Sequence, residues 1–157
     1  MTSNLQIERF FRTHAPPQLR RLFGGVYSKD ELVGRNPNGR CYVVNLQDSD
    51  EGDGTHWVAV ADFLDIPVYI DPYGITPPPV VREFMGRSRS RLPGVYSRAQ
   101  YQSLSSDQCG EYCVLFLLEL WKFRHDTLTA LRRLGEGMTE EPSVGNERLA
   151  RQVRLRR

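Results

Sequence analysis

The sequence lacks any apolar run long enough to cross a membrane. Its longest such run, Val114 to Leu118, is followed by Glu119, whereas a membrane-spanning helix needs about 20 predominantly apolar residues. The residues from Met1 to Asn4 also lack the basic and then apolar pattern of a secretory signal. We therefore expect a chain that makes no membrane contact and stays inside the cell.

Cysteine is scarce, and its three copies show no spacing typical of a disulfide framework. This favours a reducing, intracellular setting. Cys109 and Cys113 are one residue too far apart for the C-x-x-C pattern of a redox pair or of half a zinc site. Because zinc needs about four ligands, and because Cys41, His14 and His125 show no paired spacing, we expect no metal.

Charge of one sign is also lacking, since 21 basic residues are nearly balanced by 19 acidic ones and the net charge is +2. This balance argues against a surface that binds nucleic acid all round. The 157 residues, of which 39% are hydrophobic, suffice for one domain with a real core. We expect a single monomeric domain over residues 1–157, in which about residues 138–157 form a loop and a basic C-terminal tail.

Local patterns predict an α+β fold. Ser3 and Gln6 form a capping box in front of a helical apolar pattern, which predicts a helix over residues 4–13. The run from Tyr112 to Trp121 is apolar nearly all round, so we expect a buried helix over residues 109–125 that packs against a mostly antiparallel sheet. Apolar, β-branched runs predict strands over residues 41–46, 56–63 and 67–71, the last two joined as an antiparallel hairpin. Further predicted elements are a short helix around residues 19–22, a helix after the prolines 77–79, a strand over residues 95–102 and a helix capped by Asp126.

Three side chains with complementary chemistry fall at the ends of these elements. Cys109 begins the buried helix, where free backbone N–H groups and the helix dipole stabilise a thiolate. His56 begins one strand of the hairpin and Asp71 ends the other, so the carboxylate can orient the imidazole toward the cysteine. Gln102 precedes Cys109 by seven residues, and its side-chain amide can donate to a developing oxyanion.

Individual residues leave alternatives open. Gln108, directly before the cysteine, competes with Gln102 for the oxyanion role. The other two cysteines fit best as small core residues in apolar elements. A lone histidine is more often structural than catalytic, which is the interpretation we give His14 and His125.

The sequence resembles the adenain family of adenovirus-type cysteine endopeptidases in three segments whose order and spacing agree. They read Gly54-Thr-His-Trp-Val-Ala, Tyr69-Ile-Asp-Pro-Tyr-Gly and Gln102-Ser-Leu-Ser-Ser-Asp-Gln-Cys-Gly-Glu-Tyr-Cys. The resemblance implies a papain-like cysteine protease fold of the type shared with SUMO and ubiquitin-like proteases. It makes Cys109 the nucleophile, His56 the base, and Gln102 the oxyanion donor. Asp71 becomes the orienting acid, in place of the glutamate of adenain.

The same resemblance extends to substrates and activators. It implies that Trp57 and Gly110 contact the substrate, and that cleavage follows glycine in viral or virus-like structural precursor proteins. No cofactor is expected for the chemistry itself, whereas DNA or a peptide is expected as an activator. The virion and the host nucleus are then the expected locations.

Arginines gather in two parts of the chain. Arg87, Arg89 and Arg91 belong to an internal segment, and Arg154 and Arg156 lie near the end. With the resemblance, they predict sequence-independent binding of duplex DNA through phosphate contacts. An ordinary solvated surface explains the same pattern.

Two other functions compete with the endopeptidase. A deubiquitinase or SUMO-type isopeptidase would use the same cysteine, histidine, aspartate and glutamine. A catalytically inactive binding module would keep the fold without needing that set of residues. The intact set therefore argues against the inactive module.

Overall fold

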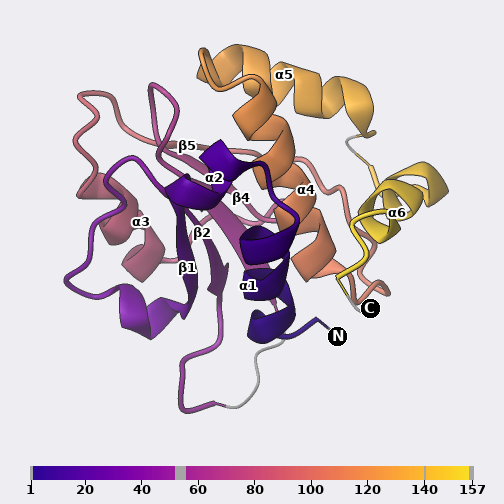
Figure 1. The fold of residues 1–157 in the computed structure, drawn as a ribbon, viewed down its shortest axis with the longest axis horizontal. Coiled ribbons are helices and arrows are strands. Elements are labelled where there is room, and N and C mark those ends of the chain that lie inside the picture. The colour runs from indigo at the N-terminus through magenta and orange to yellow at the C-terminus, as the bar shows by residue number, and fades with distance from the viewer. Residues whose placement is uncertain (1, 52–55, 140, 156–157) are drawn as a thin grey trace.

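The computed structural model describes residues 2–51, 56–139 and 141–155. Within them the chain forms a five-stranded sheet with helices on both faces (Figure 1). The strands are β1 (Phe23–Ser28), β2 (Cys41–Asn45), β3 (Trp57–Ala61), β4 (Val68–Ile70) and β5 (Val95–Tyr96). The helices are α1 (Asn4–Thr13), α2 (Pro17–Leu22), the 3-10 helix η1 (Lys29–Leu32), α3 (Pro79–Gly86), α4 (Cys109–Lys122), α5 (Thr127–Gly137) and α6 (Val144–Arg151).

The fold is α+β as predicted, but the sheet is mixed, so the prediction of a mostly antiparallel sheet holds for its central strands and not for its two edges. Its strands follow the chain order, with β2–β3 and β3–β4 antiparallel and β1–β2 and β4–β5 parallel. Parallel neighbours require a crossover connection. The segments that contain η1 and α3 provide those crossovers, and neither pairing direction is encoded in the strands themselves.

The predicted hairpin of β3 and β4 is confirmed. Ala59 lies opposite Ile70, and Ala61 lies opposite Val68. In this register the residue before β3 and the residue after β4 lie at the same end of the sheet. Those two residues are His56 and Asp71.

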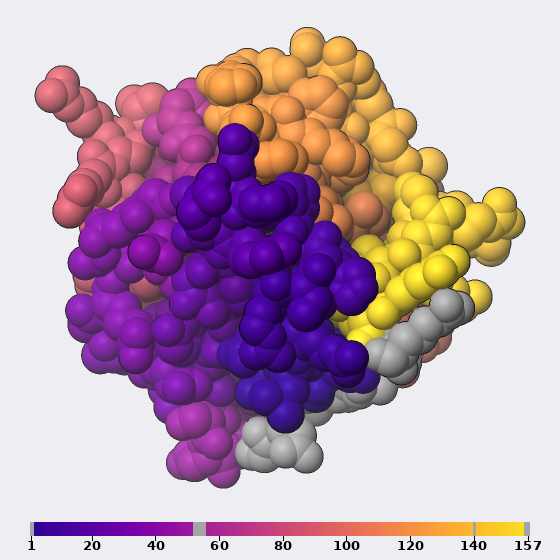
Figure 2. Space-filling model, viewed as in Figure 1, coloured from indigo at the N-terminus to yellow at the C-terminus, as the bar shows by residue number. Residues whose placement is uncertain are grey.

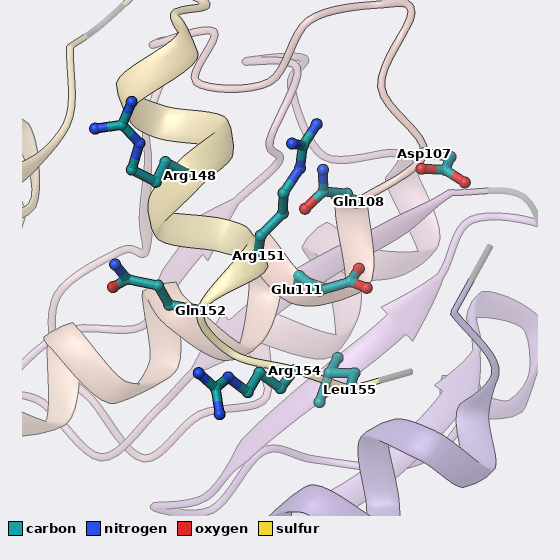
Figure 3. A pocket seen from close by; sticks show the side chains of 8 residues that line it. All are labelled: Asp107, Gln108, Glu111, Arg148, Arg151, Gln152, Arg154 and Leu155. Atoms are coloured by element: carbon teal, nitrogen blue, oxygen red, sulfur yellow. The ribbon is translucent and has the colours of Figure 1, made fainter. Parts of the chain in front are cut away.

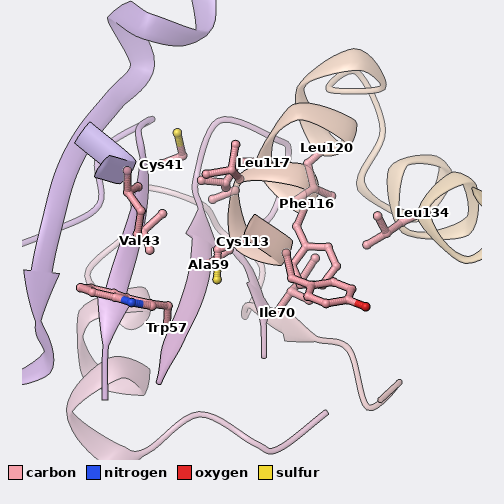
Figure 4. Packing of buried hydrophobic residues seen from close by; sticks show 14 of the residues in the cluster. Cys41, Val43, Trp57, Ala59, Ile70, Cys113, Phe116, Leu117, Leu120 and Leu134 are labelled. Atoms are coloured by element: carbon pink, nitrogen blue, oxygen red, sulfur yellow. The ribbon is translucent and has the colours of Figure 1, made fainter. Parts of the chain in front are cut away.

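The central strands are buried on both faces, which explains their continuous apolar runs. In β3, the side chains of Trp57 and Ala59 join the core under α4, whereas Val58 and Val60 join the cluster under α3. Figure 4 shows the α4 side of this core, where helix and strand side chains meet. The small Ala59 side chain leaves room for the helix that carries the candidate nucleophile.

Helix α4 begins at Cys109, as predicted, and ends at Lys122, three residues before the predicted end. Cys113 and Phe116 are fully buried in the core beneath it. The side chain of the N-cap residue Gln108 makes no capping hydrogen bond. None of the helices in the described ranges is both long and apolar enough to span a membrane.

The smaller helices agree with their sequence signals. The Ser3 hydroxyl accepts from the Gln6 backbone, and the Gln6 side chain accepts from the Ser3 backbone, so the capping box of α1 is confirmed. Asp126 caps α5 by accepting from the Thr129 backbone at 3.3 Å. Of the strand predicted over residues 95–102, only Val95–Tyr96 pairs with the sheet.

The C-terminal part differs from its prediction. Residues 144–151, expected within a loop and tail, form α6, which packs against α4. Ser143 caps the helix, and the buried Asn146 amide donates to the carbonyl oxygens of Tyr101, Thr139 and Glu141. The Ser143 cap and the bonds to Thr139 and Glu141 are local, so the sequence held a signal for this helix, whereas the bond to Tyr101 joins residues 45 positions apart.

Candidate active site

The strand ends bring His56 and Asp71 into direct contact. His56 Nε2 lies 2.9 Å from Asp71 Oδ1, and the Asp71 side chain is fully buried. The same carboxylate oxygen accepts from the Tyr73 backbone N–H at 2.7 Å. The predicted orientation of the imidazole by this acid is therefore present in the geometry.

A tight turn holds the acid in place. The Gly74 backbone N–H donates to the Asp71 carbonyl at 2.8 Å, and Gly74 has a φ of 75°. A side chain at this position would bring its Cβ within 2.6 Å of the Arg98 carbonyl oxygen. The turn therefore requires glycine both for its backbone conformation and for the space beside it.

Tyr73 completes the support of the histidine, and its role was missed in the sequence analysis. Its ring stacks on the His56 imidazole, with centroids 4.7 Å apart and planes inclined by 17°. Its hydroxyl donates to the Ser106 carbonyl at 3.3 Å, in the segment that leads to α4. The signal was available, because Tyr73 lies within the Asp-Pro-Tyr-Gly motif itself.

Cys109 lies at the start of α4 and interacts with the histidine. Cys109 is only 3% exposed to solvent. Since Nε2 of His56 contacts Asp71, the buried Nδ1 is the ring nitrogen left for the thiol, and it makes no hydrogen bond of ordinary length among the described residues. The backbone N–H groups of the first helical turn lie at the same place, where they favour negative charge.

The electrostatics of His56 suit an ion pair with this cysteine. Burial lowers the pKa of His56, but the hydrogen bond to Asp71 and the interactions with Cys109 raise it, and the net result is a pKa of about 9. The imidazole is therefore protonated at neutral pH. An imidazolium at this position can give a proton to a leaving group, which is the role of a general acid.

The other two cysteines are core residues, as expected. Cys41 and Cys113 are fully buried in the cluster between the sheet and α4. Burial raises the pKa of each thiol well above its usual range. Both therefore stay protonated and are poor nucleophiles.

Gln102 lies against the turn that follows the acid. Its backbone N–H donates to the Pro72 carbonyl at 3.0 Å, and its side chain is fully buried. Its Nε2 donates to the Ser106 carbonyl at 3.0 Å. Because a side-chain amide carries two N–H hydrogens, one donor is left after this bond for an oxyanion.

Gln108, the competing oxyanion donor, is engaged elsewhere. Its Nε2 donates to Glu147 of α6 at 3.0 Å. Glu147 also accepts from the Ser106 hydroxyl and the Tyr112 hydroxyl, each at 2.9 Å. Glu147 thus holds both sides of the nucleophile in position, and no local pattern in the sequence indicated this role.

The two predicted substrate contacts are covered by the N-terminal segment. Trp57 is 3% exposed, and its Nε1 donates to the Thr2 carbonyl at 3.1 Å. A Cβ on Gly110 would lie 2.9 Å from the Thr2 Cβ, and the Thr2 hydroxyl donates to Glu111 at 2.8 Å. A substrate that reaches Trp57 or Gly110 from this side must displace Thr2.

The predicted DNA-binding arginines do not form one surface. Arg87 donates to the carbonyl oxygens of Leu32 and Arg35, so its guanidinium ties α3 to η1. Arg89 and Arg91 are exposed beyond α3, whereas Arg154 follows α6 on the opposite side of the molecule (Figure 1). Arg156 and the segment Gly54-Thr55 of the first motif lie outside the described residues.

Comparison with known proteins identifies no family for the chain, because no protein-family model and no curated protein sequence matches it. Within the described ranges, no group of three or more His, Cys, Asp or Glu side chains is placed to hold a metal ion. The chemistry open to this site is therefore inferred from the arrangement of its own side chains.

Proposed function

We propose that the protein is a cysteine peptidase of papain-like type, with Cys109 as nucleophile, His56 as acid and base, and Asp71 as the orienting acid. The observation that carries the proposal is the His56–Asp71 contact of 2.9 Å beside a cysteine that begins a buried helix. The separate strand ends and the helix start come together only through the fold. An inactive binding module would have no need of this hydrogen-bonded arrangement.

The proposed reaction begins with the thiolate of Cys109 attacking the carbonyl carbon of the scissile amide. The negative charge on the carbonyl oxygen is stabilised by the Cys109 backbone N–H and by the free amide hydrogen of Gln102. The imidazolium of His56 gives its proton to the departing amine, and a thioester forms at Cys109. Neutral His56 then takes a proton from water, whose oxygen attacks the thioester, and release of the acid restores the ion pair.

The test of this function is covalent labelling by a peptide that ends in a glycine vinyl sulfone, read by mass spectrometry. We expect the label on Cys109 in the wild type and no label in Cys109→Ala. Cys41→Ala and Cys113→Ser should label like the wild type, because those thiols are buried away from His56. Labelling that persists in Cys109→Ala would overturn the proposal.

The substrate class we propose is a structural precursor protein cut after glycine, which is supported by the resemblance to the adenain family. Two assays distinguish this endopeptidase from an isopeptidase. One uses a glycine-containing peptide library, with and without duplex DNA, and the other uses probes built on ubiquitin-like modifiers. Cleavage of the peptides without reaction of the folded modifiers supports the endopeptidase. Faster reaction of the modifiers than of any peptide contradicts it.

A further inference from the structure

A basic cavity opens beside the start of α4. It has a volume of about 610 Å³ and lies between α4 and the C-terminal residues (Figure 3). Gln108 and Glu111 line it, and Cys109 lies between these two residues in the helix. The opposite wall carries the side chains of Arg148, Arg151 and Arg154.

These three arginines have no carboxylate partner among the described residues. The ion pairs found there join other side chains. Glu147, on the same helix as Arg148 and Arg151, is instead occupied by neutral donors. All three guanidinium groups are exposed and are left for a ligand.

The cavity continues in both directions as a groove. Toward α1, a hollow of about 810 Å³ shares Arg154 and Leu155 with it and adds Arg9 and Phe10. Toward the other end, a hollow of about 470 Å³ shares Arg148 and Arg151 with it. The space-filling view shows the C-terminal part of the chain beside α1 (Figure 2), and α1 and residues 152–155, which follow α6, line the two sides of the first hollow. We call this combined surface the α6 groove.

The chemistry of the α6 groove fits an acidic peptide. Arginine binds carboxylates through two parallel N–H···O bonds. Phe10 and Leu155 add an apolar floor for side chains, and Asp107 and Glu111 place carboxylates on the facing wall. An acidic peptide can place its carboxylates on the arginines alone, whereas the continuous phosphates of a nucleic acid would also meet the wall carboxylates, which repel them.

We propose that the α6 groove binds an acidic segment of the substrate and so selects which peptide bonds reach Cys109. That the bound segment belongs to a substrate rests on the proposed peptidase function. That the groove binds an acidic segment rests on the groove alone. Arg148, Arg151 and Arg154 are the specificity-determining residues of the proposal. Because the groove passes the first turn of α4, the acidic segment lies a few residues from the scissile bond.

The binding test uses the Cys109→Ala protein, so that it does not depend on catalysis. Fluorescence anisotropy compares a glycine-containing peptide with flanking Asp and Glu residues and its Asn and Gln counterpart. We expect the acidic peptide to bind at least ten-fold more tightly. The triple change Arg148→Gln, Arg151→Gln and Arg154→Gln should remove that preference.

A matched control removes the same charge elsewhere. Arg82→Gln, Arg89→Gln and Arg91→Gln change three exposed arginines around α3, on the other side of the molecule, and should leave the affinity within two-fold. Thermal melts show whether each variant is folded. If the α6 triple variant is not folded, the single change Arg151→Glu serves instead. It should lower the affinity for the acidic peptide and raise the affinity for a peptide with lysines.

Three results would each overturn this proposal. The first is equal affinity for acidic and neutral peptides, and the second is an equal loss of affinity in the two triple variants. The third is binding of duplex DNA that depends on the α6 arginines, without binding of acidic peptides. With the active enzyme, the α6 variant should raise KM for acidic peptides only and leave kcat unchanged. If the protein binds acidic peptides selectively but cleaves no peptide, the proposal for the α6 groove is supported and the proposed peptidase function is overturned.

Discussion

Tyr73 stacks on His56 with a centroid separation of 4.7 Å, while its backbone N–H donates to Asp71 at 2.7 Å. One residue thus fixes both the base and the acid that orients it. Tyr73 is a positioning residue, because it acts through His56 rather than on the scissile bond. The position of the imidazole therefore depends on a ring stack as well as on the carboxylate.

Tyr73→Ala should lower kcat by about ten- to a hundred-fold, because the imidazole loses the ring against which it stacks. Tyr73→Phe keeps the stack and loses only the bond to the Ser106 carbonyl, so it should stay within a few-fold of the wild type. The pH profile of peptide hydrolysis distinguishes a positioning role of Tyr73 from a purely structural one. If Tyr73 positions His56, Tyr73→Ala should also shift the apparent pKa that limits the rate. Equal losses in both variants would contradict the stacking role.

His56→Ala should lower kcat by about a hundred- to ten-thousand-fold, the range expected for loss of a general acid and base. The variant should remain folded, because the imidazole is a small part of the core. His125→Ala, at an exposed position after α4, is the control and should turn over like the wild type. Normal turnover by His56→Ala would rule out the proposed mechanism.

Gln102→Ala should reduce kcat by about ten- to a thousand-fold, as expected for one lost oxyanion donor. Gln108→Ala loses a bond to Glu147, so its main effect should be a loss of about 1 kcal/mol in unfolding free energy. Steady-state kinetics and urea unfolding of both variants check the assignment. The roles are reversed if kcat falls mainly in Gln108→Ala.

Glu147→Ala should destabilise the fold by about 1–3 kcal/mol, because Ser106, Gln108 and Tyr112 lose their common acceptor. Activity should fall with it, since these residues hold the segment around Cys109. Urea unfolding and vinyl sulfone labelling measure the two effects. The neighbouring change Arg148→Ala, at an exposed side chain, should leave stability within about 0.5 kcal/mol.

Stability should depend on pH through His56. Its folded pKa of about 9 exceeds the usual 6.5, so the stabilisation is fully present below pH 6.5 and is lost as pH rises through 9. Its size should be on the order of 1–3 kcal/mol. Urea unfolding at pH 6 and pH 9.5 should show the difference between wild type and His56→Ala shrinking at the higher pH, and a constant difference would contradict it.

Local sequence patterns predict much of this molecule, because the signals are themselves local. The capping box at Ser3, the helix start at Cys109 and the β3–β4 hairpin all depend on neighbouring residues. The hairpin also predicts the meeting of His56 and Asp71, since their strands are adjacent in the chain. These elements carry the central part of the candidate site.

The remaining features depend on contacts between distant segments. The parallel pairing of β1 with β2 follows from the crossover. Helix α6 begins at a local cap, Ser143, but its place in the fold depends on packing against α4. The bonds of Glu147 and the cover that Thr2 gives Trp57 join residues that are 35 to 55 positions apart in the sequence. No spacing rule indicates such pairs, so the tertiary structure is needed to find them.

The bonds of Glu147 also bear on when the segment around Cys109 takes its final form during synthesis. A domain folds as a unit, once enough of its chain has left the ribosome. The segment around Cys109 emerges before α6, and without Glu147 its Gln108, Ser106 and Tyr112 side chains lack their acceptor. A nascent chain that lacks α6 therefore carries Cys109 in an unfinished setting, and any reactivity of this thiol that depends on these bonds arises only once α6 has been translated.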